Sequence, residues 1–329
     1  MRNVLVTTGK MFLSKTPSYV ILYVTAVCNA RCPYCFYWEP IQNANRLNEL
    51  KLEEIEKISK SFGKITYLTL TGGEPFLRTD IEKIVKIFVK NNEVDFISIP
   101  TNGGVPKLAL PKIEEMLSSC PDTAFRIALS VDGIGKEHDD IRRIQGLFDR
   151  ILETYHGLDI FRQKYHNLNI DATTTFSSYT EKKVFEILDY FKKNLKIDNH
   201  VLNLVRGDVK DPVIKNIDIE AYERAVREVE NTTNSTKINR NDFRLKLLKS
   251  IKLVMRDIIL KTVKERKMVL PCVAGKRFLV INEKGEVYPC DIFINHKDKM
   301  LGSLREHNYD IKEILETEEA KKIVKWIKD

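Results

Sequence analysis

Apolar runs of strand length alternate with amphipathic segments of helix length over residues 19–231 of this 329-residue chain. The six strand-like runs lie near Tyr19–Thr25, Ile65–Leu70, Asp95–Ile99, Phe125–Val131, Leu168–Thr174 and His200–Val205. The helix-like segments that follow them lie near Leu52–Phe62, Asp80–Lys90, Leu110–Ser119, Gly146–Tyr155, Glu181–Asn194 and Asp218–Asn231. Regular alternation of this kind predicts an α/β fold with a parallel sheet, because each helix returns the chain through a right-handed crossover. The unbroken apolar runs indicate strands that are buried on both faces.

The pattern changes after residue 231. A polar stretch, Asn231–Lys237, precedes a basic segment, Asp242–Lys267, that reads as one long helix. Phe278–Pro289 then has the alternation of a β-hairpin, and Ile311–Lys328 reads as a last helix. We therefore expect four parts: an N-terminal extension (1–14), a parallel α/β domain (15–232), a linker with the long helix (233–268) and a small C-terminal α+β domain (269–329).

The bulk composition is that of an ordinary globular protein, with 43% apolar and 30% charged residues. Neither a run of about 18 apolar residues nor a signal-peptide pattern is evident, so we expect a cytoplasmic protein without a membrane span. The formal charge is +8, from 54 basic and 46 acidic residues. This excess fits a solvated surface, although nine Lys or Arg from Arg244 to Lys267 also allow a nucleic-acid-binding helix.

Three of the six cysteines lie within eight residues, directly after the first strand-like run: Cys28, Cys32 and Cys35. Clustered thiols in a long chain without a signal peptide predict metal ligands rather than disulfides. Three thiolates can hold three irons of a [4Fe–4S] cube and leave the fourth iron open for chemistry. A zinc site is the alternative if a fourth ligand comes from elsewhere in the chain.

Small and polar residues follow three consecutive strands, in the segments Thr71–Pro75, Pro100–Gly103 and Ser130–Gly133. The carboxyl ends of parallel strands meet at one edge of the sheet, which is where α/β folds place their sites. Glycines there let a ligand approach the backbone closely. Each segment taken alone also reads as a simple turn, with Pro75 at a first helical position.

Together these motifs resemble the radical S-adenosylmethionine (SAM) superfamily over residues 15–230. The resemblance implies a partial (β/α)6 barrel of TIM type and a [4Fe–4S] cluster held by Cys28, Cys32 and Cys35. It implies SAM at the open iron, contacted by Tyr34, Gly72, Gly73, Glu74, Asn102, Ser130, Asp132 and Arg142. Such an enzyme cleaves SAM reductively to a 5′-deoxyadenosyl radical that takes hydrogen from a substrate, and its electron donor is a small protein such as ferredoxin or flavodoxin.

The C-terminal pattern around Cys272 and Cys290 resembles SPASM or Twitch domains, which carry auxiliary Fe–S clusters. The resemblance makes both thiols candidate ligands of a possible second cluster, although the further cysteines of those domains do not follow in this sequence. Asp291 occupies the place of an acid that takes a substrate proton in sulfatase-maturing enzymes, and an exposed acid at the end of a hairpin is the plainer interpretation. Cys120 lacks such neighbours, and we expect it to be a structural thiol.

The leading hypothesis is therefore a radical SAM oxidoreductase or maturase that modifies a peptide or protein side chain. Oxidation or rearrangement of a small alcohol or sugar-like metabolite is the second hypothesis. A non-enzymatic zinc- or Fe–S-containing module that binds nucleic acid is the third, although nucleic acid is the less expected partner.

Overall fold

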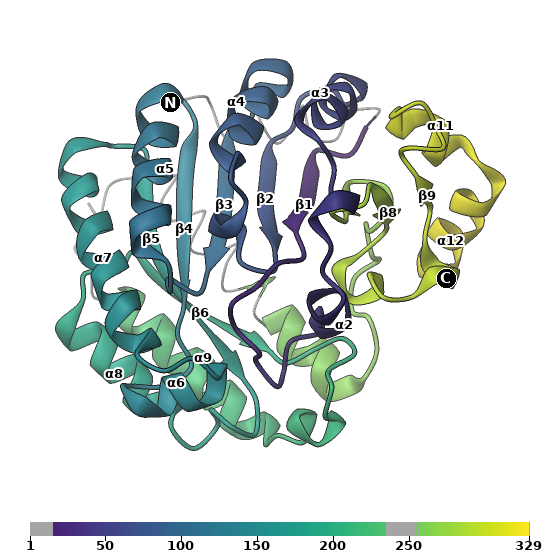
Figure 1. Cartoon of the computed structure of the whole chain (residues 1–329). Coiled ribbons are helices and arrows are strands. Elements are labelled where there is room, and N and C mark those ends of the chain that lie inside the picture. The colour runs from purple at the N-terminus through teal and green to yellow at the C-terminus, as the bar shows by residue number, and fades with distance from the viewer. Residues whose placement is uncertain (1–15, 235–253, 256, 329) are drawn as a thin grey trace, which may run out of the picture.

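The computed structural model describes residues 16–234, 254–255 and 257–328, and its sheet has nine strands in the order β6-β5-β4-β3-β2-β1-β7-β8-β9. Figure 1 shows the strands lined by helices along one side of the sheet. The strands are β1 (Tyr19–Thr25), β2 (Tyr67–Gly72), β3 (Phe96–Thr101), β4 (Ala124–Ser130), β5 (Leu168–Phe176), β6 (Asn199–Leu204), β7 (Phe278–Ile281), β8 (Glu286–Tyr288) and β9 (Gly302–Ser303). The helices are α2 (Trp38–Gln42), α3 (Leu52–Ser61), α4 (Ile81–Asn92), α5 (Pro106–Ser119), α6 (Lys136–Arg142), α7 (Leu147–Lys164), α8 (Val184–Asn194), α9 (Ile219–Asn234), α11 (Ile311–Glu316) and α12 (Glu318–Lys328).

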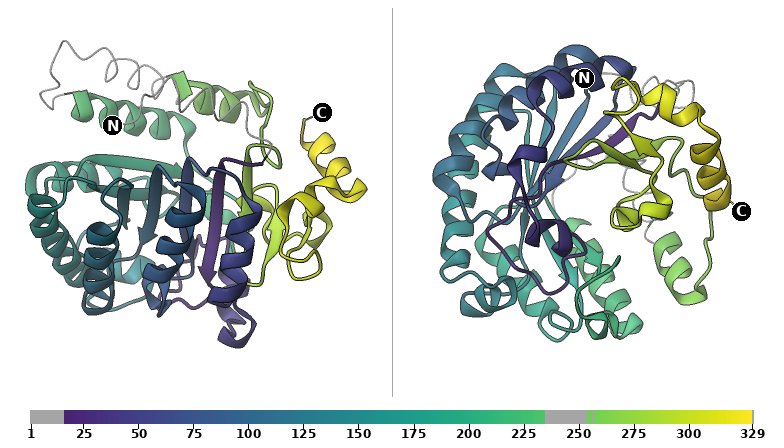
Figure 2. Two further views of the ribbon diagram at one scale, coloured as in Figure 1. Left: turned by 90° about the horizontal axis from the view of Figure 1, so that it is seen from above. Right: turned by 45° about the vertical axis from the view of Figure 1, so that its right-hand side comes forward.

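The first six strands pair in parallel, each with the next along the chain, which confirms the predicted parallel sheet. Figure 2 shows the sheet curving around an inner face while the helices cover the outer one. The C-terminal segment extends this sheet, because β7 pairs in parallel with β1 and then turns into the antiparallel strands β8 and β9. The expected α/β partial barrel with a small C-terminal α+β unit is confirmed.

Three helical expectations need correction. The segment expected at Gly146–Tyr155 continues to Lys164 as α7. The segment Ile311–Lys328 forms two helices, because Thr317 has an extended backbone and its hydroxyl accepts a hydrogen bond from the Ala320 N–H, as an N-cap does. Helix α5 begins four residues earlier than expected and contains Pro111, since Pro106 is set for a helix start. The predicted helix Asp242–Lys267 lies partly outside the described residues, and residues 254–255 and 257–265 are helical.

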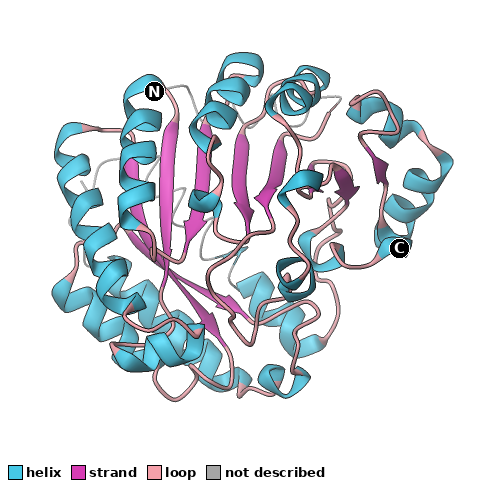
Figure 3. Cartoon of the chain, in the orientation of Figure 1, coloured by secondary structure: helices cyan, strands magenta, loops and turns pink. Residues whose placement is uncertain are grey.

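Helices and loops surround the strands of the curved sheet (Figure 3). The side chains on its two faces differ in chemistry. On β4, Phe125, Ile127 and Leu129 join the core beneath the helices. The alternate residue Arg126 points to the other face, where its Nε donates to Asp171 Oδ2 of β5 at 2.5 Å. The inner face of these strands is thus buried only in part and by polar as well as apolar side chains, since Asp171 is 3% exposed while Arg126 is half-buried. An inner face with polar groups can bind a polar ligand instead.

Aromatic side chains occupy the first positions of four neighbouring strands. The ring of Tyr19 lies 4.7 Å from that of Tyr67 and 4.9 Å from that of Phe278, and Tyr67 stacks on Phe96 at 4.7 Å. These rings fill the inner face at the amino ends of the strands, because aromatic pairs gain from offset and edge contacts at such distances. The free end of the inner face is therefore the one at the carboxyl ends of the strands.

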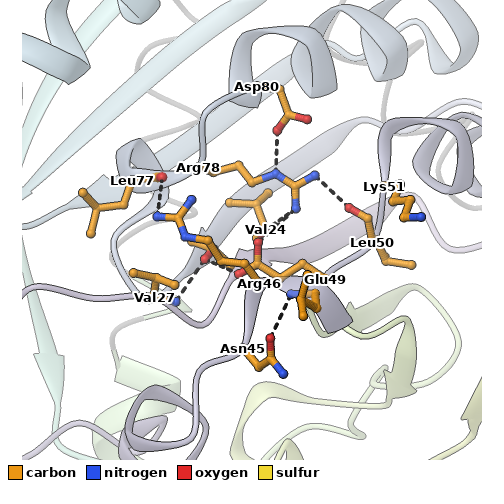
Figure 4. A network of polar contacts seen from close by, with 12 residues as sticks. Val24, Val27, Asn45, Arg46, Glu49, Leu50, Lys51, Leu77, Arg78 and Asp80 are labelled. Carbon is orange, nitrogen blue, oxygen red and sulfur yellow. Dashed lines mark hydrogen bonds and ion pairs between the residues drawn. The ribbon is translucent and has the colours of Figure 1, made fainter.

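A buried arginine joins three segments near the start of the cysteine loop (Figure 4). Arg78 donates to the carbonyl oxygens of Val24 and Leu50 at 3.0 and 2.7 Å. Its guanidinium also lies 3.4 Å from the Glu49 carboxylate and 2.5 Å from that of Asp80. Arg78 and Glu49 are both 6% exposed, so the buried charge of Glu49 depends on Arg78 for compensation, while Arg78 also pairs with Asp80.

We expect Arg78→Met to lower the free energy of unfolding by about 3–5 kcal/mol, because it leaves the buried Glu49 charge uncompensated. Lys86→Met is the matched control: it breaks the exposed 2.7 Å pair with Glu115 and should cost less than about 1 kcal/mol. Urea unfolding followed by circular dichroism measures both values. Equal midpoints for the two variants would contradict a structural role for Arg78.

Candidate functional site

The three clustered cysteines follow β1 in a tight loop. The Cys35 N–H donates to the Cys32 carbonyl at 3.2 Å, and the Ala30 N–H donates to Cys28 Sγ at 3.4 Å. Burial raises the pKa of the Cys28 and Cys35 thiols to about 12 and also raises that of Cys32. Metal binding would replace the protons of these thiols, because the thiolate is the ligand form.

The loop opens onto a cavity of about 240 Å³ at the carboxyl ends of the strands. Ten of the eleven residues that the sequence assigned to the cluster and to SAM line this cavity: Cys28, Cys32, Cys35, Tyr34, Gly72, Gly73, Glu74, Asn102, Ser130 and Arg142. They come from the ends of β1 to β4 and from α6. The sequence motifs thus converge on one place in the fold, while their individual contacts with a ligand stay predictions.

The two glycines of the β2 end let the cysteine loop approach closely. A Cβ on Gly72 would lie 2.2 Å from the Thr25 carbonyl oxygen, and one on Gly73 would lie 2.2 Å from that of Val27. The gap is closed by hydrogen bonds from the Gly73 N–H to the Thr25 carbonyl and from the Glu74 N–H to the Val27 carbonyl, at 2.8 and 2.9 Å. Larger residues would push the thiol loop away from the sheet.

The Glu74 carboxylate connects the ends of β2 and β3. It accepts hydrogen bonds from the Asn102 N–H and the Thr101 hydroxyl, both at 2.8 Å. Burial raises the pKa of Glu74, and these two hydrogen bonds oppose the shift. The Asn102 amide in turn donates to Asn29 Oδ1 at 2.8 Å, which ties β3 to the cysteine loop.

Asp132 lies behind the cavity wall and is fully buried. Its Oδ2 accepts from the Tyr34 hydroxyl at 2.5 Å and from Arg142 Nε at 2.8 Å, and its Oδ1 accepts from the Thr175 N–H at 2.7 Å. The predicted contact of Asp132 with SAM is untested. The geometry gives Asp132 a positioning role, since it orients Tyr34 and Arg142, which do line the cavity.

A buried histidine supports Asp132 from the far side. The Asp132 N–H donates to His138 Nδ1 at 3.1 Å, which leaves the proton of the neutral ring on Nε2. Burial, assisted by the nearby Arg142 charge, lowers the pKa of His138 to about 4. The ring therefore stays neutral at ordinary pH.

Sequence motifs did not reveal the cavity lining from β5 and β6. Thr175, Asn203 and Arg206 also line the cavity. Thr175 and Asn203 are register partners near the carboxyl ends of their strands, where the strand-end rule applied to β2, β3 and β4 also holds. That rule could have identified both positions, whereas Arg206 lies in a loop without a motif.

Two of the three C-terminal candidates, Asp291 and Cys290, are linked to Arg206 by hydrogen bonds. Arg206 donates to Asp291 Oδ2 at 2.7 Å, and the Cys290 thiol donates to Asp291 Oδ1 at 3.3 Å. Asp291 is only 8% exposed, so the interpretation as an exposed acid is wrong. Cys272 lies before β7 at an intermediate exposure, and Cys120 packs in the main core as expected.

The chemistry of the donor set fits the first cluster. Three thiols around one cavity suit a cube in which each of three irons takes one thiolate. In the described residues, no three His, Cys, Asp or Glu side chains converge as ligands of a single metal ion. The segment 272–329 contains two cysteines, Cys272 and Cys290, which are the thiol candidates for a second Fe–S cluster.

Comparisons with known proteins place two family models along the chain. The family model of the radical SAM superfamily matches residues 22–191, and the SPASM model, described as an iron–sulfur cluster-binding domain, matches residues 272–329. The chain is 27% identical to an AdoMet-dependent heme synthase of Methanosarcina barkeri, over 94% of the chain and 84% of that protein. It is 26% identical to a cysteine-type anaerobic sulfatase-maturating enzyme of Clostridium novyi, over 90% and 78% respectively.

A solved structure shares the fold. Native anSMEcpe with bound AdoMet and the Kp18Cys peptide superposes with a TM-score of 0.65 at 20% identity, over 95% of this chain and 84% of that one. No helix among the described residues has the length and apolarity that crossing a bilayer requires.

We expect Gly73→Ala to weaken SAM binding by about tenfold or more, because the added methyl would meet the Val27 carbonyl and displace the thiol loop. Gly63→Ala is the control, since among the described residues its Cβ would meet only the Thr16 hydroxyl, at 3.3 Å. Equilibrium dialysis with labelled SAM and iron analysis of reconstituted protein measure the effect. Wild-type affinity in Gly73→Ala would show that the close approach is dispensable.

We also expect buried His138 to make stability fall in acid. Below pH 6.5 the unfolded chain takes up a proton on this ring, whereas the folded protein does so only near pH 4. Because of this group, the free energy of unfolding should therefore fall by about 2 kcal/mol when the pH is lowered from 7 to 5. Urea unfolding at both pH values measures this fall in the free energy of unfolding. The fall should be about 2 kcal/mol smaller in His138→Gln than in wild type, and it should be unchanged in the exposed control His156→Gln. An identical pH dependence in all three proteins would refute the assignment.

Proposed function

The chain belongs to the radical SAM superfamily and carries a SPASM iron–sulfur cluster-binding domain, and on this basis we propose that it is a maturase that modifies a peptide or protein side chain. The observation that carries the proposal is the convergence of the three thiols and the predicted SAM contacts on one cavity. When bound there, the [4Fe–4S] cluster and SAM supply a 5′-deoxyadenosyl radical that takes a hydrogen atom from an unactivated carbon.

The residues of the chain would position this chemistry. Cys28, Cys32 and Cys35 would hold the cluster at the end of β1. Arg142, oriented by Asp132, places a cation in the cavity wall for the SAM carboxylate. A fixed guanidinium suits a carboxylate because its N–H groups form a planar fork.

Two features support a peptide substrate. One is the relationship to the sulfatase-maturating enzyme of Clostridium novyi, which spans 90% of this chain. The other is Asp291, which follows Cys290 and lies beside the cavity residue Arg206. Asp291 is the candidate for accepting a substrate proton, because a buried carboxylate can serve as a general base.

A small-molecule substrate is the second candidate. It is favoured by the match to the AdoMet-dependent heme synthase, which spans 94% of this chain at 27% identity. The polar inner face suits a metabolite with hydroxyl or carboxyl groups. The third hypothesis, a non-enzymatic nucleic-acid module, is wrong, because the family is one of enzymes.

The activity itself has a direct test. Anaerobically reconstituted protein with dithionite and SAM should form 5′-deoxyadenosine and methionine, measured by liquid chromatography and mass spectrometry. Cys32→Ala should reduce the rate by about a hundredfold or more, because one iron of the cluster loses its ligand. Cys120→Ala is the matched control, since this thiol lies in the core. Equal rates for wild type and Cys32→Ala would overturn the assignment.

The substrate class is tested by stimulation of the same reaction. Peptides from cells of the source organism should raise the rate of 5′-deoxyadenosine formation, and digestion with proteinase K should abolish this increase. If the component that stimulates the enzyme survives digestion and passes a membrane with a cutoff of about 1 kDa, the small-molecule candidate is favoured. A small protein such as flavodoxin or ferredoxin stays the predicted donor, and dithionite replaces it in both assays.

A further inference from the structure

Arg206 is held in the cavity wall by two contacts of its side chain and by the path of the loop that follows it. Its guanidinium carbon lies 5.8 Å above the ring of Phe36, the residue after Cys35. One N–H group donates to Asp291 at 2.7 Å. The next residue, Gly207, has a φ of +71°, and a Cβ there would lie 2.8 Å from Phe36 Cβ, so this loop can only take that path with glycine.

The remaining donors of Arg206 have no acceptor within the described residues. A guanidinium has five N–H groups, and the single bond to Asp291 uses one of them. The side chain is 47% exposed and lines the cavity. A planar fork of donors beside a cavity matches an anion with two oxygen atoms.

Polar groups without protein partners lie on the same wall. In the described part of the chain, no residue hydrogen-bonds to the side-chain amide of Asn203 or to the side-chain hydroxyl of Thr175, although both line the cavity. None of these three side chains belongs to the motifs that match the SAM contacts. Polar groups in a cavity without protein partners require water or a ligand.

We infer that Arg206, with Asn203 and Thr175, forms a substrate subsite that binds a carboxylate. Arg206 anchors the carboxylate, and the two polar side chains accept or donate hydrogen bonds to the rest of the substrate. The Asp291 pair favours a carboxylate over a phosphate, because the negative charge of Asp291 repels a bound anion and repels a dianion more strongly than a monoanion. The inference rests on the proposed function, since it names what the substrate of that site carries.

Binding of small probes tests the subsite without any turnover. The probe is N-acetylglutamate N-methylamide, titrated calorimetrically into anaerobically reconstituted protein saturated with SAM. Its glutamine counterpart is the neutral control, and the O-phosphoserine counterpart represents phosphate. Wild type should bind the glutamate probe about tenfold more tightly than the glutamine probe, and Arg206→Gln should lose this preference.

Three further variants make the outcome specific. Arg224→Gln is the matched control, because Arg224 is also an exposed arginine paired with an aspartate, 3.6 Å from Asp218, but lies on α9. It should keep the wild-type preference. Arg206→Lys should keep part of the preference for the glutamate probe, since a lysine retains the charge but lacks the paired N–H donors of a guanidinium. Asp291→Asn should bind the glutamate probe more tightly, because the competing carboxylate is gone.

Several results would overturn the inference. These are a preference that persists in Arg206→Gln, tighter binding of the phosphoserine probe than of the glutamate probe, or weaker binding by Asp291→Asn. Loss of SAM affinity in Arg206→Gln would instead assign Arg206 to the cofactor. Failure of peptides to stimulate the enzyme, with carboxylate binding intact, would refute the peptide proposal and leave the subsite standing.

Discussion

The close contact between the cysteine loop and the end of β2 is the constraint on which the site depends. Gly72 and Gly73 leave room for the carbonyl groups of Thr25 and Val27, and backbone hydrogen bonds from Gly73 and Glu74 then hold the loop against the sheet. Any side chain at these glycines would separate the thiols from the strand ends. The cavity exists because these two segments, which belong to different strands, can touch.

Buried ion pairs then fix what surrounds that contact. Arg78 with Glu49 holds the start of the loop, and Asp132 with Arg142 shapes the wall beyond it. The first pair spans 29 residues of chain and the second spans 10. A buried charge without its partner would cost several kcal/mol, of order 3–5. Charge pairing therefore acts here as a means of fixing segments relative to one another.

The C-terminal domain contacts the cysteine loop region in two ways, by strand pairing and by hydrogen bonds. Strand β7 adds to the edge of the parallel sheet at β1, directly before the cysteine loop. The buried carboxylate of Glu283, in the β7–β8 turn, accepts a hydrogen bond from the Tyr37 hydroxyl, two residues after Cys35. Its backbone carbonyl accepts from the Leu50 N–H at 2.7 Å. The SPASM segment thus supports the loop that carries the thiols.

The sequence by itself determined the local parts of this protein. Strand and helix periodicity located the six βα units, and the spacing of Cys28, Cys32 and Cys35 named a cluster site, because both signals lie within short stretches of chain. Tertiary structure alone decided that Asp132 lies behind the cavity wall and that Arg206 meets Asp291, 85 residues further along. It also decided that Ile311–Lys328 breaks at Thr317. Such pairings depend on strand order and on packing between distant segments, which no local pattern of residues records.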